Sequence, residues 1–140
     1  MPLVEFEKDD FLRNKVVDVS WYLIKIGEFS EESTADGEGT KYVFRDCKIV
    51  KDDDSGDEKW AGVPVKIELP TKKEGRGFIL GFYAALQGYS SVDELQAAGK
   101  TRMRIEEAAG QMIVAFVENN TWQGRTTNKI NHKYRPVKAA

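Results

Sequence analysis

The chain has 140 residues, of which 41% are hydrophobic and 31% are charged. This length favours one domain, residues 1–140, and the composition is too apolar for a disordered chain. No apolar run approaches the roughly 20 residues of a membrane span, and a single cysteine excludes an intrachain disulfide and a Cys-only zinc site. Because the sequence shows no secretory signal, we expect a cytoplasmic protein that does not contact membranes.

Acidic and basic side chains are unevenly distributed along the chain. Residues 1–70 carry 17 Asp and Glu against 10 Lys and Arg, whereas residues 71–140 carry 6 against 11. A basic region attracts polyanions, but folding could equally mix the two signs on one surface. The net charge of −2 argues against a strongly basic, non-specific nucleic-acid binder.

The first part of the chain is predicted to contain an arm and two strands. Residues 5–15 are charged and indicate a leading arm, covering residues 1–15, or one short helix. Residues 16–29 are rich in strand-forming side chains, and the polar residues 30–40 predict a loop. Residues 41–50 predict the second strand.

An acidic turn and a third strand follow. In residues 52–58, Gly56 can supply the positive φ of a turn. Residues 60–69 alternate between apolar and other side chains, which predicts a strand with one face in the core. The predicted core positions are Val63, Val65, Ile67 and Leu69. Pro64 cannot donate a hydrogen bond, so its nitrogen must face outward or lie at a bulge.

The period of the pattern then changes from two to between three and four. Phe78, Phe82 and Leu86 recur at helical spacing, which predicts a helix over residues 77–87 that ends before Gly88. Ser91, followed three residues later by Glu, predicts the N-cap of a second short helix.

Two strands complete the predicted order. Residues 111–118 are apolar on both faces, residues 119–124 predict a turn, and residues 125–134 predict the last strand, with residues 137–140 as a short loose tail. The predicted order is three strands, then a helix or helical pair, then two further strands. This is the order of the OB-fold, a mainly β, five-stranded, partly open Greek-key barrel. Ligands of that fold cross strands 2 and 3 and the neighbouring loops, which here are residues 30–40 and 119–124.

Four segments in this order carry a resemblance to a known family. They are WYLIKI (21–26), KYVF (41–44), WAGVPV (60–65) and WQGRTTNKI (122–130), the last leading to YRP (134–136). With these segments the chain resembles the bacteriophage-type single-stranded DNA-binding proteins of OB fold. In that family an aromatic-Ala-Gly-apolar-Pro segment opens the third strand, and an aromatic-x-Gly-Arg turn joins the last two. One departure is Asp46, an acidic residue among the basic residues of the second strand.

The resemblance implies a protein that is not an enzyme and needs no cofactor. It would coat and protect single strands in phage replication or recombination, in the host cytoplasm. Sequence-independent binding needs flat side chains on which bases stack and cations that contact phosphates. The candidate stacking residues are Tyr42, Phe44, Trp60 and Trp122. The candidate cations are Arg45, Lys48, Lys66, Arg125, Lys129 and Lys133.

Several of these candidates have a structural alternative. Strand 41–50 has two phases: either Tyr42 and Phe44 are in the core and Arg45 faces out, or Val43, Cys47 and Ile49 are in the core and the aromatic side chains face out. Trp60 and Trp122 could instead anchor turns against the core.

Motifs for catalysis or metal binding are weak. The chain has no Gly-rich phosphate loop, and its acidic run lacks the spacing of a calcium loop. His132, the single histidine, has no orienting partner in sequence, and Cys47 is typical of a buried residue. A metal nuclease assembled from dispersed carboxylates is a remote alternative.

Another alternative is an OB-like protein-interaction module, such as a replication accessory or virion component, that does not bind nucleic acid. The acidic first half favours it. Whether the ligand is DNA or RNA, whether the protein is a homodimer, and whether it binds replication or recombination proteins stay open.

Overall fold

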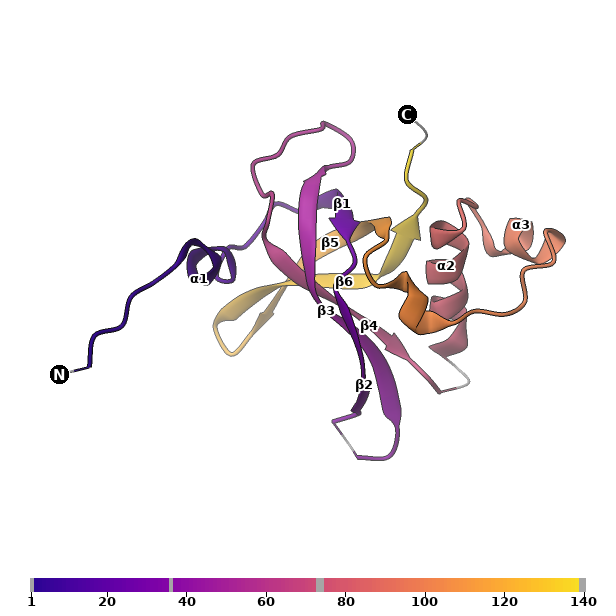
Figure 1. Ribbon diagram of the computed structural model, residues 1–140, viewed down its shortest axis with the longest axis horizontal. Helices are drawn as coiled ribbons and strands as arrows, with labels where there is room; N and C mark the ends of the chain where they lie inside the picture. The colour runs from indigo at the N-terminus through magenta and orange to yellow at the C-terminus, as the bar shows by residue number, and fades with distance from the viewer. Residues whose placement is uncertain (1, 36, 73–74, 139–140) are drawn as a thin grey trace.

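The computed structural model describes residues 2–35, 37–72 and 75–138. It shows an antiparallel sheet with one short helix near the N-terminus on one side and the other helices on the opposite side (Figure 1). The elements are α1 (Lys8–Leu12), β1 (Ser20–Lys25), β2 (Glu28–Ser33), β3 (Thr40–Asp52), β4 (Pro64–Pro70), α2 (Arg76–Leu86), α3 (Val92–Ala97), the 3-10 helix η2 (Ile105–Ala108), β5 (Met112–Trp122) and β6 (Arg125–Arg135). The predicted mainly β class and the helices between the third and fourth predicted strands are confirmed.

The first predicted strand is divided at Gly27 into β1 and β2, so the sheet has six strands instead of five. A Cβ at Gly27 would overlap the carbonyl oxygen of Arg45, so only glycine allows this close approach to β3. The polar residues 30–33, predicted as loop, belong to β2. They form a strand despite their polarity because β2 is an edge that pairs with β3 alone.

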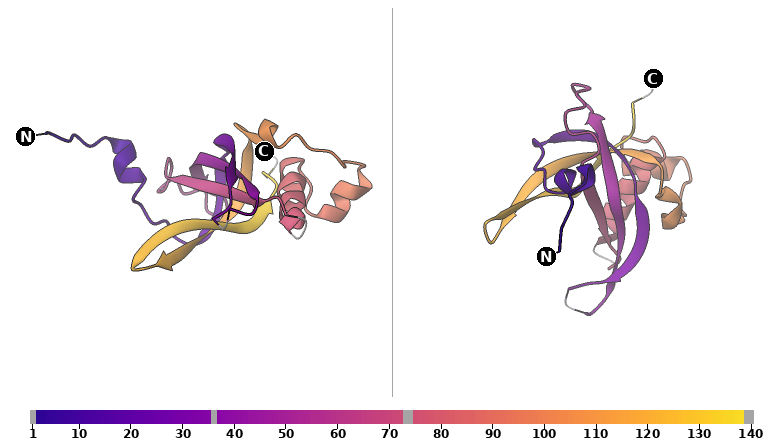
Figure 2. Two further views of the ribbon diagram at one scale, coloured as in Figure 1. Left: turned by 90° about the horizontal axis from the view of Figure 1, so that it is seen from below. Right: turned by 60° about the vertical axis from the view of Figure 1, so that its left-hand side comes forward.

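The sheet is open. Its hydrogen-bonded order is β2-β3-β1-β5-β6, and β4 pairs with β3 beside this path. Among the described strands no ladder joins β4 to β6, so the expected barrel does not close. Pro64 and Pro70 at the two ends of β4 lack the N–H that a further ladder would use. The β5–β6 hairpin extends beyond the rest of the sheet (Figure 2).

A bulge in β3 decides the phase of that strand. Asp46 has a φ of 54°, and the register with β4 shifts between Phe44 and Cys47. The extra residue of the bulge exchanges the two faces of the strand for the side chains that follow it. Phe44 before the bulge and Cys47 and Ile49 after it are therefore all buried. A regular strand would have buried either Phe44 or the other two, which are the two alternatives predicted from the sequence. Phe44 is 0% exposed, and its prediction as a stacking residue is therefore wrong.

The core lies between the sheet and α2. Phe82 of α2 packs with its ring centroid 5.7 Å from that of Phe44 and 5.2 Å from that of Tyr134. The four predicted core positions of the third strand are buried, as expected: Val63, Val65, Ile67 and Leu69. In the described part of the chain, no helix is long and apolar enough to cross a membrane.

Local signals in the sequence correctly predicted one helix start and one turn. The Ser91 side chain accepts a hydrogen bond from the N–H of Glu94 at 3.2 Å, which confirms the predicted N-cap of α3. Gly56 has the expected positive φ of 76°. The predicted turn at 119–124 is shorter than expected: β5 continues to Trp122, and only Gln123 and Gly124, with φ of 49° and 76°, form the turn.

Candidate nucleic-acid interface

A groove of about 360 Å³ lies where four parts of the chain meet. These are the segment after α1, the bulge of β3, the start of β4 and the start of β6. The side chains around it are long cations and short amides or hydroxyls rather than aromatic residues. They come from Arg13, Asn14, Lys15, Arg45, Asp46, Pro64, Val65, Lys66, Arg125, Thr126, Thr127 and Asn128.

A second hollow of about 320 Å³ continues this groove along the open seam between β4 and β6. The two share Lys66, Thr127 and Asn128. The second hollow adds Glu68, Asn120, Lys129, Ile130 and His132. We call the two hollows together the seam groove. The gap that keeps the sheet from closing therefore forms an elongated depression.

The seam groove carries an excess of positive charge. Six of its lining residues are cationic, namely Arg13, Lys15, Arg45, Lys66, Arg125 and Lys129, and two are acidic, namely Asp46 and Glu68. Such a depression, with one sign of charge in excess, raises the local concentration of anions. A flexible polyanion is the ligand that this lining suits best.

The two acidic residues are each engaged by cations. Asp46 lies 3.0 Å from the guanidinium of Arg13. Glu68 lies 2.8 Å from the ammonium of Lys66 and 3.2 Å from that of Lys41. Burial favours a higher pKa of Glu68, but the hydrogen bonds from Lys66 and Lys41 outweigh it and lower this pKa below its ordinary value. These ion pairs partly offset the positive charge of Arg13, Lys66 and Lys41.

Three cations of the seam groove have no ion pair within the described residues: Lys15, Arg125 and Lys129. An unpaired ammonium or guanidinium can contact a phosphate without first breaking a salt bridge. Arg125 and Lys129 were predicted from the sequence, and Lys15 was not. These three side chains are therefore the cations of the seam groove that are free to bind an anion, within the described residues.

Other predicted cations are committed to acidic partners. The Arg45 guanidinium lies 2.7 Å from one oxygen of Glu32 and 2.8 Å from the other, and these hydrogen bonds, with one from Ser30, lower the pKa of Glu32 to about 2. Lys48 lies 3.4 Å from Asp9 and does not line the groove. The structure brings Arg45, Lys66, Arg125 and Lys129 together, and it leaves Lys48 aside.

Lys133 is the remaining predicted cation, and it also lies outside the seam groove. Its ammonium is 3.6 Å from Glu118 and 5.2 Å from the ring centroid of Phe116. In a regular strand Lys129 and Lys133 would share a face, because side chains alternate with a period of two. They do not share one here, because His132 between them has a φ of 58° and the β5–β6 register shifts at this point. Regular period-two alternation does not apply across a bulge.

The predicted aromatic residues differ sharply in exposure. Trp122 is 73% exposed at the tip of the hairpin, directly opposite Arg125 in the register. Trp60 is half-buried, and its indole N–H donates to Asp18 at 3.2 Å. Tyr42 is half-buried with its ring 5.6 Å from that of Phe29. Of the four predicted aromatic residues, Trp122 therefore has the most exposed side chain, and it lies opposite Arg125 of the seam groove.

The seam groove also contains residues that the sequence did not single out as binding residues. Arg13 and Lys15 come from the predicted arm, which Asn128 ties to β6 by a hydrogen bond from its Nδ2 to the carbonyl of Lys15 at 2.9 Å. His132 stacks on Phe78 with 4.1 Å between ring centroids. Burial, and then the charge of Lys129, lower the pKa of His132, so its ring is neutral at pH 7. No local pattern predicts these contacts, because Asn128 and Lys15 are 113 residues apart and His132 and Phe78 are also distant in the sequence.

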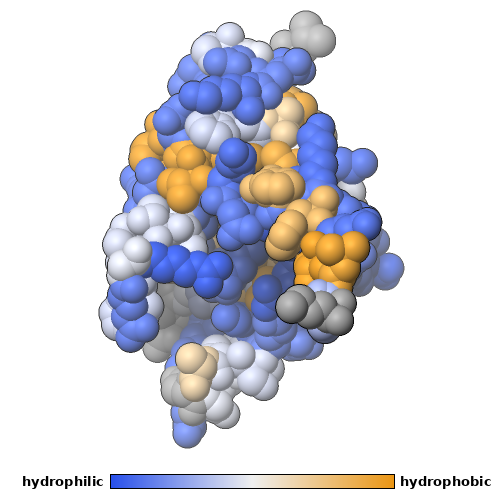
Figure 3. Space-filling view, turned by 90° about the vertical axis from the view of Figure 1, so that its left-hand side faces the viewer, coloured by the Kyte–Doolittle hydropathy of each residue, from blue (hydrophilic) through white to orange (hydrophobic). Residues whose placement is uncertain are grey.

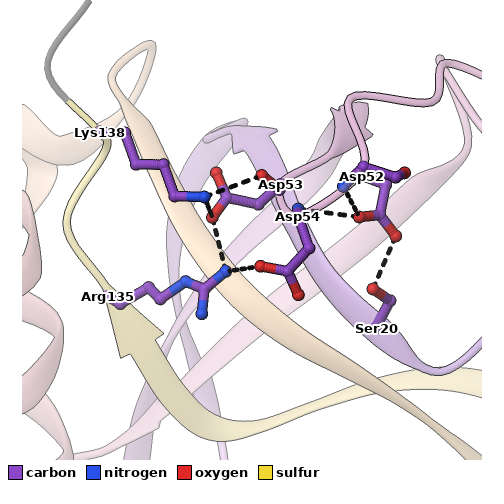
Figure 4. A network of polar contacts seen from close by, with 7 residues as sticks. Ser20, Asp52, Asp53, Asp54, Arg135 and Lys138 are labelled. Carbon is purple, nitrogen blue, oxygen red and sulfur yellow. Dashed lines mark hydrogen bonds and ion pairs between the residues drawn. The ribbon is translucent and has the colours of Figure 1, made fainter.

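The acidic turn of the first half lies away from the seam groove and has its own cations (Figure 4). The Arg135 guanidinium lies 2.6 Å from both Asp53 and Asp54, and Lys138 lies 3.5 Å from Asp53. Asp52 accepts a hydrogen bond from Ser20 at 2.6 Å. Within the part of the chain that the structure describes, no cluster of His, Cys, Asp and Glu could hold a metal ion.

The sequence matches no family model, and a search of curated proteins finds no match.

Proposed function

We propose that this protein binds single-stranded nucleic acid in the seam groove, with little dependence on sequence. The observation that carries the proposal is the excess of cations along the groove, with Lys15, Arg125 and Lys129 unpaired and the exposed ring of Trp122 opposite Arg125. Cations would contact successive phosphates, and a base would stack on Trp122. Backbone contacts and stacking are open to every base, so neither selects a sequence.

The proposal extends to the OB fold and to the resemblance found in the sequence. If β1 and β2 are taken as one strand bent at Gly27, the order of elements is that of an OB-fold. The pairing of β1 with both β3 and β5, and of β3 with β4, supports this assignment. On the resemblance, the biological role is the coating and protection of single-stranded DNA in phage replication or recombination.

The first test uses the fluorescence of Trp122. Titration with a short oligonucleotide at low salt is expected to quench the emission, and most of this quenching is lost in Trp122→Phe. Trp122→Ala is expected to weaken binding by about 5- to 100-fold, since one stacked base contributes roughly 1–3 kcal/mol. Tyr89→Ala, which removes a partly exposed ring outside the seam groove, is the control and should bind normally. A folded protein without quenching at low salt contradicts the proposal.

The second test measures how affinity depends on salt. Each phosphate contact with a single strand contributes roughly 0.7 to the slope of log K against log salt. The double variant Arg125→Ala/Lys129→Ala should reduce this slope by about 1.4. The control Lys25→Ala/Lys51→Ala removes two exposed cations outside the groove and should leave the slope unchanged. Equal slopes for the wild type and both double variants would show that the binding surface lies outside the seam groove.

A protein-interaction module is the second candidate. It is favoured by the ion pairs that already occupy Arg45, Lys48, Lys66 and Lys133. Recovery of a protein partner in the presence of nuclease, with no oligonucleotide shift at low salt, would select this function over nucleic-acid binding.

A further inference from the structure

We propose that the N-terminal arm, residues 2–7, binds a second copy of this chain, in a groove between α2 and η2, so that copies associate head to tail. This contact is independent of nucleic acid and goes beyond the proposed function.

The arm carries an apolar and an acidic side. Leu3, Val4 and Phe6 are 82%, 68% and 69% exposed. In an extended chain, Val4 and Phe6 lie on one side, and Glu5 and Glu7 lie on the other together with Leu3. The arm projects from the body without covering it (Figures 1 and 2). Apolar side chains are visible among polar ones on the face from which it leaves (Figure 3). Three large apolar side chains exposed within the six residues of the arm indicate a segment that docks on another surface.

The receiving groove has the complementary lining. It has a volume of about 670 Å³, within the range of roughly 300–1,000 Å³ that is typical of ligand sites. Leu86, Met103 and Ala108 supply apolar surface. Arg102 and Arg104 supply two positive charges against the one negative charge of Glu107 in the described lining. The hydroxyl of Tyr83 donates to the carbonyl of Arg102 at 2.8 Å, which holds the arginine segment against α2.

Charge supports a match between arm and groove. Arg102 has no ion pair within the described residues, and Arg104 has one marginal contact, 4.0 Å to Glu107 three residues along. Both arginines are exposed and free to meet the carboxylates of the arm. With the apolar side of the arm on Leu86 and Met103, Glu5 and Glu7 would face this cationic rim. An arginine–carboxylate pair next to buried apolar surface is a favourable interface contact.

The contact must be between two molecules. The arm and the helices α2 and α3 lie at opposite ends of the molecule in two perpendicular views (Figures 1 and 2). Six extended residues span at most about 20 Å, so the arm cannot reach around the sheet to the groove of its own chain. Because the two surfaces differ, the interface is heterologous and each copy can bind one neighbour at each end.

The first experiment is sedimentation velocity of the full chain without nucleic acid, from about 1 μM to about 1 mM, the range of weak and transient interfaces. The expected result is association that grows with concentration and passes beyond a dimer. Val4→Ser/Phe6→Ser and, separately, Arg102→Glu/Arg104→Glu should each abolish it. Val19→Ser, which removes an apolar residue 53% exposed outside both surfaces, is the control and should associate normally. A wild-type chain that stays monomeric up to 1 mM overturns the proposal.

Mixing the two defective variants gives the decisive test. The arm variant keeps an intact groove, and the groove variant keeps an intact arm, so a mixture should form dimers and stop there. A mixture that remains monomeric, or a wild type that stops at a symmetric dimer, overturns the head-to-tail arrangement. All the substituted side chains are exposed, so folding of the body should be unchanged by circular dichroism. No nucleic acid is present in these experiments, so a chain that does not associate can still bind nucleic acid. Likewise, a chain that does not bind nucleic acid can still associate.

Discussion

Asn128 on β6 fixes the backbone of the segment that carries Lys15. Its Nδ2 donates to the carbonyl of Lys15 at 2.9 Å, and its Oδ1 accepts from the N–H of Val17 at the same distance. One amide thus places a cation of the N-terminal segment beside the cations of the β5–β6 hairpin. The seam groove depends on this pairing across 113 residues.

Asn128→Ala should loosen the groove and destabilise the fold. Both backbone groups lose their partner, so we expect the free energy of unfolding to fall by about 1–3 kcal/mol and limited proteolysis to cut near residue 15. Urea denaturation and peptide mapping measure the two effects. Asn120→Ala, which removes the other amide of the hairpin that lines the groove, should leave the midpoint unchanged. Identical midpoints for Asn128→Ala and wild type would show that this amide does not hold the segment.

Asp46→Asn should tighten binding of a single strand. The change removes one of two acidic groups in the seam groove and one of the two ion pairs of Arg13, which keeps its pair with Asp9. Asparagine tolerates the positive φ at this bulge. We expect about a three- to tenfold gain in affinity at low salt that disappears at high salt, measured by fluorescence anisotropy. Asp93→Asn on α3 is the control, since Asp93 is exposed and remote from the groove. A gain that persists at high salt would rule out a charge effect.

Gly27→Ala should be strongly destabilising. A Cβ there would overlap the Arg45 carbonyl oxygen and the backbone of Asp46, so β2 would have to move away from the bulge of β3. We expect a loss of at least about 3 kcal/mol, measured by thermal and urea unfolding. Gly81→Ala on α2 has open space around its Cβ and should be neutral or stabilising because alanine favours helix. If both variants melt alike, the close approach at Gly27 is not as tight as described.

Tyr134→Phe should stabilise the protein. The hydroxyl of Tyr134 is buried and has no hydrogen-bond partner among the described residues. Removing a buried polar group without a partner is expected to raise the free energy of unfolding by about 1 kcal/mol. Tyr22→Phe gives the contrast, because its hydroxyl donates to the carbonyl of Asp18 at 2.6 Å and the substitution should cost about 1 kcal/mol. A loss of stability in Tyr134→Phe would indicate that this hydroxyl is satisfied in solution.

Stability should fall at alkaline pH because of the same tyrosines. Burial, and then the carboxylate of Asp18, raise the pKa of Tyr22 to about 12, and burial raises that of Tyr134 further. Unfolded tyrosine ionises near pH 10, so this contribution is complete below about pH 10 and is lost as the pH rises through 12. Urea midpoints between pH 8 and 12 measure the loss, and Tyr22→Phe should reduce it. A flat profile contradicts the raised pKa values.

Local pattern predicted those parts of the fold that depend on near neighbours. The alternation of Val63, Val65 and Ile67 is a period of two that any half-buried strand shows, and the Ser91 cap depends on a residue three positions away. The division at Gly27 and the bulge at Asp46 were missed, because each is caused by the backbone of another strand. Phe44 was misplaced for the same reason.

The candidate site divides in a similar way. Arg125, Lys129 and Trp122 could be proposed from one hairpin segment, since a short turn places its flanking side chains together. Lys15 and His132 could not, because their place in the groove depends on Asn128 and on the irregular register of β6.

The sequence by itself determined the strands and helices that have a regular apolar period, the approximate position of the last hairpin turn and the supply of cations in the second half, because these follow from short-range sterics and composition. Only the tertiary structure decided that the sheet stays open and that cations from both halves line the open seam. The acidic turn, in contrast, lies outside this seam, and its Asp53 and Asp54 form ion pairs with Arg135. Electrostatic surroundings depend on distances in space, which a linear pattern of charges does not contain.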